Sequence, residues 1–221
     1  MKKILLLLFL LPFSLFAQVI DDFSDGDFTQ NPVWSGTTAN FIINNNKQLQ
    51  LNAEGEGVAY LSLPVTEYES MEWHFWIREA FAPSGNNYTD VWLSADIADL
   101  TQVTHGYFLR FGEGGSSDAI TLFRKDADGQ QQICRGTEGA IAASFAVAVK
   151  VTCDREGNWM IQTCYDNSGI YIIEAQGTDD TYGRNGYFGF WSKYTSRTRK
   201  KSISTMSMSA RALSTMSRLF C

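Results

Sequence analysis

The fold is decided by one stretch of the sequence: Val147-Ala-Val-Lys-Val-Thr-Cys153, Asp154-Arg-Glu-Gly-Asn158 and Trp159-Met-Ile-Gln-Thr-Cys164. Apolar and polar residues alternate on both sides of a turn that contains Gly, which is typical of a β-hairpin with one buried face. In such a hairpin Cys153 lies opposite Trp159, and Cys164 lies near Ala148. A disulfide bond between these two cysteines is therefore not expected.

Similar strand-like runs recur outward from this hairpin about every ten residues. The segments between them are rich in Gly, Asn and Asp, and only residues 98–101 and 140–143 hint at a helical turn. This spacing predicts an antiparallel sandwich or barrel without alternating helices. The predicted strands are Phe41–Asn44, Gln48–Ala53, Val58–Leu63, Met71–Phe81, Tyr88–Ala95, Gly106–Phe111, Ala119–Arg124, Gln130–Arg135, Phe145–Cys153, Trp159–Cys164, Ile170–Ala175 and Tyr187–Tyr194.

The composition is acidic. The chain has 221 residues with 18 Lys and Arg against 24 Asp and Glu, so its formal net charge is −6. If an export segment that contains Lys2 and Lys3 is removed, 16 Lys and Arg remain against 24 Asp and Glu, which gives a net charge of −8. We therefore expect no basic surface for nucleic acid or for anionic membranes.

The N-terminus has the pattern of a secretory signal peptide. Met1-Lys2-Lys3 is basic, Ile4–Phe16 is an apolar run, and Ala17-Gln18 is a plausible cleavage point. The run is shorter than the roughly 20 residues of a membrane span. We expect a signal peptide at 1–17, a β-sandwich domain at 18–201, and an exported product with no membrane span.

Aromatic side chains occupy both faces of several predicted strands. In Met71–Phe81 the apolar residues Trp73, Phe75 and Ile77 share one face, and Glu72, His74, Trp76 and Arg78 share the other. Two interpretations remain open: loops cover the outer faces, or outer aromatic rings stack on the sugar rings of a glycan or polysaccharide. The second gives as candidate ligand-binding residues Trp76, Trp92, Trp191, His74, Asp90 and Arg110.

Four acidic residues lie close together near the N-terminus, at Asp21, Asp22, Asp25 and Asp27. Calcium prefers such oxygen ligands, so Asp22, Asp25 and Asp27 are candidate ligands of a structural Ca²⁺. The alternative is that these side chains cap local turns. Structural zinc is not expected, because the sequence has no Cys-x-x-Cys pair and only two histidines.

The sequence shows no catalytic constellation. Retaining glycoside hydrolysis needs two carboxyl groups about 5 Å apart, and no Glu-x-Asp-x-Glu run occurs. Glu67, Glu69 and Glu72 come nearest, and their place at a strand entry indicates solvated charges. His74 and His105 lack a Gly-x-Ser-x-Gly motif or a cysteine partner. We expect no enzymatic activity.

Residues 202–221 differ in composition from the rest of the chain. They hold six serines and three of the six methionines, and they have no Gly, Asp, Glu, Trp or Tyr. A disordered tail is one interpretation. The other is a single-base shift near Lys200 or Lys201, because codon junctions from Lys201 onward permit the alternating strand Ile-Tyr-Phe-Asp-Asp-Val-Tyr-Val-Gly-Pro. A gene sequence in which no one-base restoration gives a longer reading frame would contradict the shift.

Several motifs resemble the N-terminal jelly-roll domain of large secreted bacterial surface proteins of the lamin-tail-like multidomain type. They are Asp22-Phe23-Ser-Asp25-Gly26-Asp27-Phe28, Pro32-x-Trp34-x-Gly36, Gln48-Leu-Gln-Leu-Asn52, Trp73-His-Phe75, Gly106-Tyr107-Phe108, Gly157-Asn158-Trp159 and Tyr187-Phe188-Gly189. The resemblance covers about residues 19–201 and implies an all-β, two-sheet antiparallel β-sandwich similar to the concanavalin A-like lectin and glucanase fold. It also implies a closing Phe-Asp-Asp strand beside the N-terminal Asp-Asp-Phe strand, which this sequence lacks.

Together these features predict a non-catalytic surface or adhesion module that is secreted or displayed on the cell surface. It would be a monomeric domain of a larger surface protein, with a glycan or polysaccharide as its partner. The alternatives are a glycoside-hydrolase-related or accessory domain of an extracellular enzyme, and a purely structural spacer.

Overall fold

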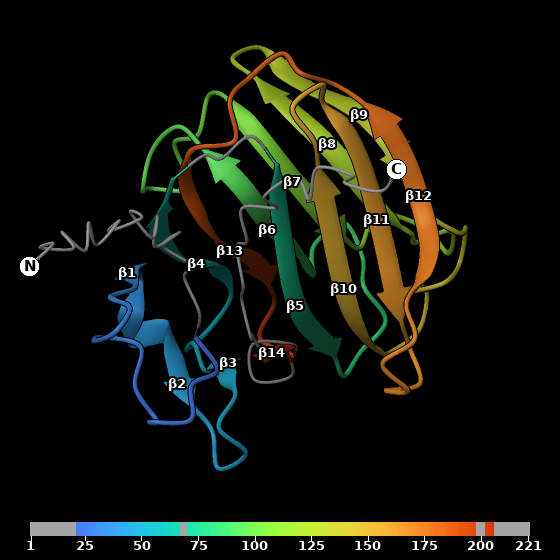
Figure 1. Ribbon diagram of the computed structural model, residues 1–221. Coiled ribbons are helices and arrows are strands. Elements are labelled where there is room, and N and C mark those ends of the chain that lie inside the picture. Colours follow the sequence, from blue (N-terminus) through green and yellow to red (C-terminus); the bar gives the residue numbers. More distant parts are fainter. Residues whose placement is uncertain (1–20, 67–69, 198–201, 206–221) are drawn as a thin grey trace, which may run out of the picture.

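Two seven-stranded antiparallel sheets pack face to face in the computed structural model, which describes residues 21–66, 70–197 and 202–205 (Figure 1). The predicted all-β sandwich is confirmed. The first sheet has the order β1-β4-β13-β6-β7-β8-β9, and the second has the order β12-β11-β10-β5-β14-β3-β2. In Figure 1 the strands β5, β10, β11 and β12 form the layer nearer the viewer.

The strand bounds follow the predicted runs closely. The first sheet contains β1 (Ser35–Gly36), β4 (Gly57–Val65), β6 (Tyr88–Ala95), β7 (Gly106–Phe111), β8 (Ile120–Asp126), β9 (Gly129–Arg135) and β13 (Gly186–Tyr194). The second contains β2 (Phe41–Ile43), β3 (Leu49–Leu51), β5 (Met71–Glu79), β10 (Phe145–Cys153), β11 (Asn158–Cys164), β12 (Ile172–Thr178) and β14 (Ser202–Thr205).

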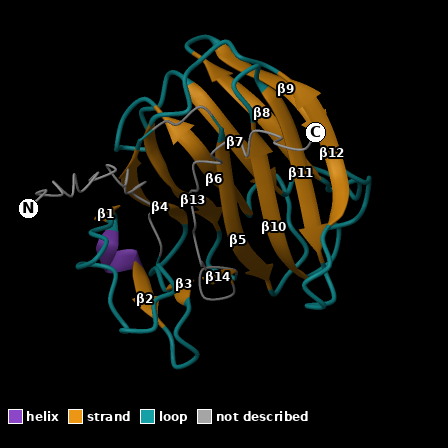
Figure 2. Cartoon of the chain, in the orientation of Figure 1, coloured by secondary structure: helices purple, strands orange, loops and turns teal. Residues whose placement is uncertain are grey.

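All twelve predicted strands are present, and β1 and β14 are additional. Of the described residues only Thr38–Asn40 form a helix, the 3₁₀ element η1, coloured purple beside β2 in Figure 2. The segments 98–101 and 140–143 form hydrogen-bonded turns and bends instead of helices. In the described part of the chain, no helix has the length and apolar character that crossing a membrane requires.

The hairpin β10–β11 has the predicted register. Cys153 pairs with Trp159, and Cys164 pairs with Ala148. Cys134, Cys153 and Cys164 are all buried, and no disulfide joins any two of them. The prediction that Cys153 and Cys164 are not bonded to each other is confirmed. The predicted signal peptide at 1–17, Cys221 and the segment 67–69 lie outside the described residues.

The core lies between the sheets, where the apolar face of each strand meets the opposite layer. On β5 the alternation holds: Trp73, Phe75 and Ile77 are buried, and Trp73 stacks on Trp159 of β11 with ring centroids 5.7 Å apart. Full burial of each such side chain contributes about 2–3 kcal/mol. Residues of the opposite parity on β5, including His74 and Trp76, consequently point to the outer face of the second sheet.

The second sheet extends past residue 201, where the sequence analysis ended the domain. Ser202 pairs with Glu79 of β5 and Ile203 pairs with Gln50 of β3, so β14 lies between these strands. Strand pairing uses backbone groups, and the unusual composition of the segment therefore does not prevent it. Asp21–Phe23 is not part of a strand, contrary to the expected Asp-Asp-Phe strand. Residues 206–221, and with them most of the region bearing on a base shift, lie outside the described residues.

Candidate functional site

Three of the predicted ligand-binding residues form one row across the first sheet. Trp191 of β13 pairs with Asp90 of β6, and Asp90 pairs with Arg110 of β7. Trp92 lies two residues further along β6, opposite Phe108. Because residues two apart on a strand face the same way, these side chains share the outer face of the first sheet.

His74 and Trp76 are not part of this group. They lie on β5, opposite Lys150 and Ala148 of β10, and therefore on the outer face of the second sheet. His74 is bonded to Glu72 with Nε2 and Oε1 2.7 Å apart, and its ring meets Tyr171 edge-on. The six predicted residues thus divide between the two opposite outer faces of the sandwich.

Asp90 and Arg110 form a bidentate ion pair. The guanidinium Nε donates to Oδ1 of Asp90 at 2.8 Å, and Nη2 donates to Oδ2 at 2.7 Å. Burial raises the pKa of Asp90, while the hydrogen bond and the charge of Arg110 act in the opposite direction. The fork geometry fixes both side chains and occupies one lone pair on each carboxylate oxygen.

Aromatic rings enclose the Arg110 guanidinium. Its central carbon lies 4.7 Å from the ring centroid of Tyr88, 5.2 Å from that of Phe108 and 5.5 Å from that of Phe123. Tyr88 in turn lies against Trp191, with centroids 5.5 Å apart. Cation–π contacts of this kind stabilise a partly desolvated charge by about 0.5–2 kcal/mol.

The loop 96–105 covers part of this face. Leu100 and Val103 pack on Trp92 and Phe108 in a second apolar cluster that is separate from the main core. The loop is held by Ser62, whose hydroxyl donates to the Ala98 carbonyl oxygen at 2.7 Å. Trp92 is consequently only 5% exposed, as the loop-cover interpretation expects, whereas Trp191 remains partly exposed.

A pocket of about 350 Å³ remains beside the covered region. We call it the first-sheet pocket. The Asp90–Arg110 pair and the partly exposed Tyr88 and Trp191 are among the residues that line it. The residues that line it are Val58, Tyr88, Asp90, Trp92, Leu100, Thr101, Val103, Phe108, Arg110, Lys125, Gly129, Gln130 and Trp191.

Sequence reasoning missed Tyr88, Lys125 and Gln130 as pocket residues. Tyr88 has the same parity as Asp90 and could have been found by extending the alternation by one step. Lys125 and Gln130 belong to the hairpin β8–β9, whose place beside β7 depends on long-range pairing. No local pattern marks them.

The predicted calcium ligands Asp22, Asp25 and Asp27 each accept a hydrogen bond from a nearby backbone N–H. The Asp22 carboxylate accepts a hydrogen bond from the backbone N–H of Ser24. In the same way, Asp25 accepts one from the N–H of Asp27, and Asp27 accepts one from the N–H of Thr29. Across 21–66, 70–197 and 202–205, no three His, Cys, Asp or Glu side chains gather as a metal ion would require. The hydrogen bonds are those of turn caps, which is the alternative that the sequence left open.

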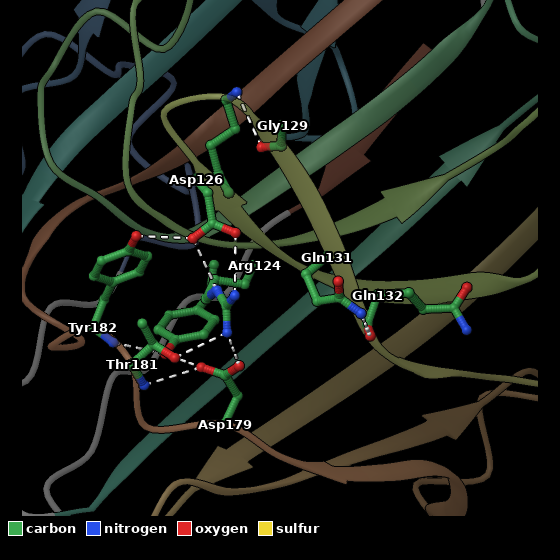
Figure 3. Close-up of polar contacts among 10 residues, drawn as sticks. Arg124, Asp126, Gly129, Gln131, Gln132, Asp179, Thr181 and Tyr182 are labelled. Carbon is green, nitrogen blue, oxygen red and sulfur yellow. Dashed lines mark hydrogen bonds and ion pairs between the residues drawn. The ribbon is translucent and has the colours of Figure 1, made fainter.

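A second polar cluster ties the segment 179–182 to β7 and β8, and we call it the Arg124 cluster (Figure 3). Arg124 is bonded to Asp126 through Nε and Nη2, and its Nη1 donates to both Asp179 and Thr181. Tyr107 donates to Asp179 at 2.7 Å, and Tyr182 donates to Asp126 at 2.8 Å. Every charged member has a partner of opposite charge, which indicates a structural role.

No protein-family model matches the sequence, and no curated protein matches it significantly. Solved structures do match. The exoplasmic domain of VIP36 in its form bound to Ca²⁺ and Man3GlcNAc has a TM-score of 0.62 at 11% identity, over 88% of this chain and 89% of that one. The carbohydrate recognition domain of Emp46p, potassium-bound, has a TM-score of 0.62 at 10% identity, over 88% and 96%.

The carbohydrate recognition domain of Emp47p has a TM-score of 0.58 at 12% identity, over 80% of this chain and 87% of that one. At these identities the likeness concerns the fold. The chain therefore has the concanavalin A-like sandwich fold of lectin carbohydrate recognition domains.

Proposed function

We propose that this chain is a secreted, non-catalytic carbohydrate-binding module whose glycan site is the first-sheet pocket. The observation that carries the proposal is the row Trp191–Asp90–Arg110, which sets a partly exposed indole ring next to a rigid charged pair. An indole face can stack on the apolar face of a sugar ring, and neighbouring polar groups can bond its hydroxyls. The names of the solved neighbours, which include mannose-bound forms of VIP36, support the same class of ligand.

The pocket does not support glycoside hydrolysis. Of the described residues that line it, Asp90 alone is a carboxylate, and both of its oxygens are bonded to Arg110. Hydrolysis by the common mechanisms needs two carboxyl groups, one of them free to transfer a proton. The geometry therefore favours binding over catalysis.

A neighbouring hollow of about 490 Å³ is a weaker candidate. It is lined by Glu56, Gly57, Val58, Asn86, Lys193, Tyr194 and Thr195. Its aromatic residue, Tyr194, is 5% exposed and therefore offers little ring surface for stacking.

The outer face of the second sheet carries Trp76, which is partly exposed like Trp191. Trp76 is therefore the matched control for substitution of Trp191.

The test is a glycan-array and polysaccharide-retention screen of the full chain, with and without Ca²⁺, followed by Trp191→Ala and Trp76→Ala. Calcium is included because the solved neighbours comprise calcium-bound and metal-free forms of VIP36. We expect Trp191→Ala to lower the affinity for the retained glycan by about tenfold, in line with the loss of one stacking contact. Trp76→Ala should leave the affinity unchanged.

Three results would contradict the proposal. A folded protein that retains no glycan favours a structural spacer. Loss of binding in Trp76→Ala, with normal binding in Trp191→Ala, would move the site to the second sheet. Turnover of a polysaccharide would restore the hydrolase alternative.

A further inference from the structure

The first-sheet pocket is lined by two cationic hydrogen-bond donors, Arg110 and Lys125. Both oxygens of Asp90 already accept from Arg110 through Nε and Nη2. The third guanidinium nitrogen, Nη1, takes no part in this pair, and Arg110 lines the pocket. A neutral sugar hydroxyl both donates and accepts, whereas a charged donor is best matched by an anionic acceptor.

Lys125 is the second cationic donor that lines the pocket. Its ammonium Nζ donates to the Gly129 carbonyl oxygen at 3.2 Å, the contact drawn to Gly129 in Figure 3. Among the described residues Lys125 has no carboxylate partner. A lysine ammonium carries three N–H groups, so two remain for a ligand.

The charges that line the pocket sum to +1. Asp90 and Arg110 cancel, and Lys125 is left over. The whole chain has a net charge of −6, so the pocket has the opposite sign to the molecule. This excess of positive charge favours a ligand rich in acceptor oxygens.

We propose that the pocket takes a sugar residue with an anionic substituent, the carboxylate of a uronic acid or a sulfate ester, beside Arg110 Nη1 and Lys125 Nζ. This inference rests on the proposed function, because Trp191 supplies the stacking surface for the ring. The oxygens of the anionic group accept hydrogen bonds from Arg110 Nη1 and Lys125 Nζ. The Asp90–Arg110 pair holds the donor in place and is not itself altered by the ligand.

The test compares ligands that differ only in charge. Binding of oligogalacturonate to the full chain is measured by calorimetry against its neutral methyl ester, and binding of a sulfated galactan against the unsulfated galactan. We expect one acidic ligand to bind about fivefold more tightly than its neutral counterpart at low ionic strength, as for a single exposed charge pair. The preference should shrink in 0.5 M salt, where the Debye length is about 4 Å. A preference for oligogalacturonate over its ester identifies the anionic group as a carboxylate, and a preference for the sulfated galactan identifies it as a sulfate ester.

Variants assign the preference to the pocket. Lys125→Gln should remove most of the preference, measured as the ratio of the affinities for the acidic and neutral members of the pair. The matched control is Lys150→Gln, because Lys150 lies on the second sheet over the ring of Tyr171. Lys150→Gln should preserve the preference.

Equal affinity for the acidic and neutral members of both pairs would overturn the inference, and the proposed glycan site would stand. A preference that persists in Lys125→Gln would also overturn it, because the anionic group would then be bound elsewhere. Failure of every ligand, together with an empty glycan screen, would contradict the proposed function itself.

Discussion

Glu79 is a fully buried carboxyl group. It ends β5 on the buried face, is 0% exposed, and has no hydrogen bond to either carboxylate oxygen within the described residues. Burial raises its pKa from 4.5 to about 8; the nearby Thr89 hydroxyl acts against this, and the carboxylates of Asp118 and Asp90 add to it. The folded chain therefore keeps a proton that the unfolded chain loses at lower pH.

The raised pKa of Glu79 makes the folded state less stable as the pH rises. The native state binds more protons than the unfolded state between pH 4.5 and about 8, so Glu79 lowers the free energy of unfolding as the pH rises through this range. Glu79→Gln removes the titration, and we expect it to be more stable than the parent at pH 8 by on the order of a few kcal/mol. Urea unfolding at pH 5, 6.5 and 8 measures this difference.

The control for this experiment is Glu54→Gln, since Glu54 is exposed. This variant should follow the pH profile of the parent. Parallel profiles for Glu79→Gln and the parent would show that Glu79 is solvated or paired in solution.

Individual residues also mark the limit of reasoning from sequence. Trp76 and Trp191 both sit at outward positions of well-formed strands, and both are partly exposed. Alternation predicts that each faces outward, and this is what the structure shows. It does not reveal which sheet each strand joins, because that depends on pairing between distant segments. The predicted site therefore combined residues from two opposite faces.

At the scale of elements, the Arg124 cluster connects the segment after β12 to the first sheet. Asp179 follows β12 and accepts from both Tyr107 and Arg124. Burial favours the neutral acid, but the hydrogen bonds from Tyr107, Thr181 and Arg124 outweigh it and lower the pKa of Asp179. The carboxylate is thus charged at neutral pH and holds the segment in place.

We expect Arg124→Met to loosen this segment. The variant keeps much of the aliphatic stem and removes the bonds to Asp126, Asp179 and Thr181, which should lower the free energy of unfolding by about 1–3 kcal/mol. Hydrogen exchange of the amides in 179–182 should accelerate. The hairpin β10–β11 serves as the internal reference, and unchanged exchange in 179–182 would show that other contacts hold the segment.

Elements were the most predictable part of the structure. Period-two alternation bounded by Gly, Asn and Asp located twelve strands, because a sandwich buries one face of each strand and leaves the turns in water. The two missed strands were not marked by alternation. β1 has two residues, and β14 lies in a segment whose composition differs from that of the domain.

At the scale of the whole molecule, the sandwich has two outer faces with different chemistry. The first sheet carries the charged pair, the aromatic cage and the covering loop 96–105. The second sheet carries His74 bonded to Glu72 and Lys150 over Tyr171. We propose that the ligand binds to the first face, and each face carries a partly exposed tryptophan that can report on binding, Trp191 on the first and Trp76 on the second.

The most direct test uses the indole N–H signals of the six tryptophans. A ¹H–¹⁵N spectrum of the full chain is recorded during titration with the glycan that the screen identifies, and Trp→Phe variants assign each signal. We predict that the signal of Trp191 shifts most, that of Trp92 shifts with it, and that of Trp76 stays in place. A titration that shifts the signal of Trp76 and leaves those of Trp191 and Trp92 unchanged would contradict the assignment of the glycan site to the first sheet.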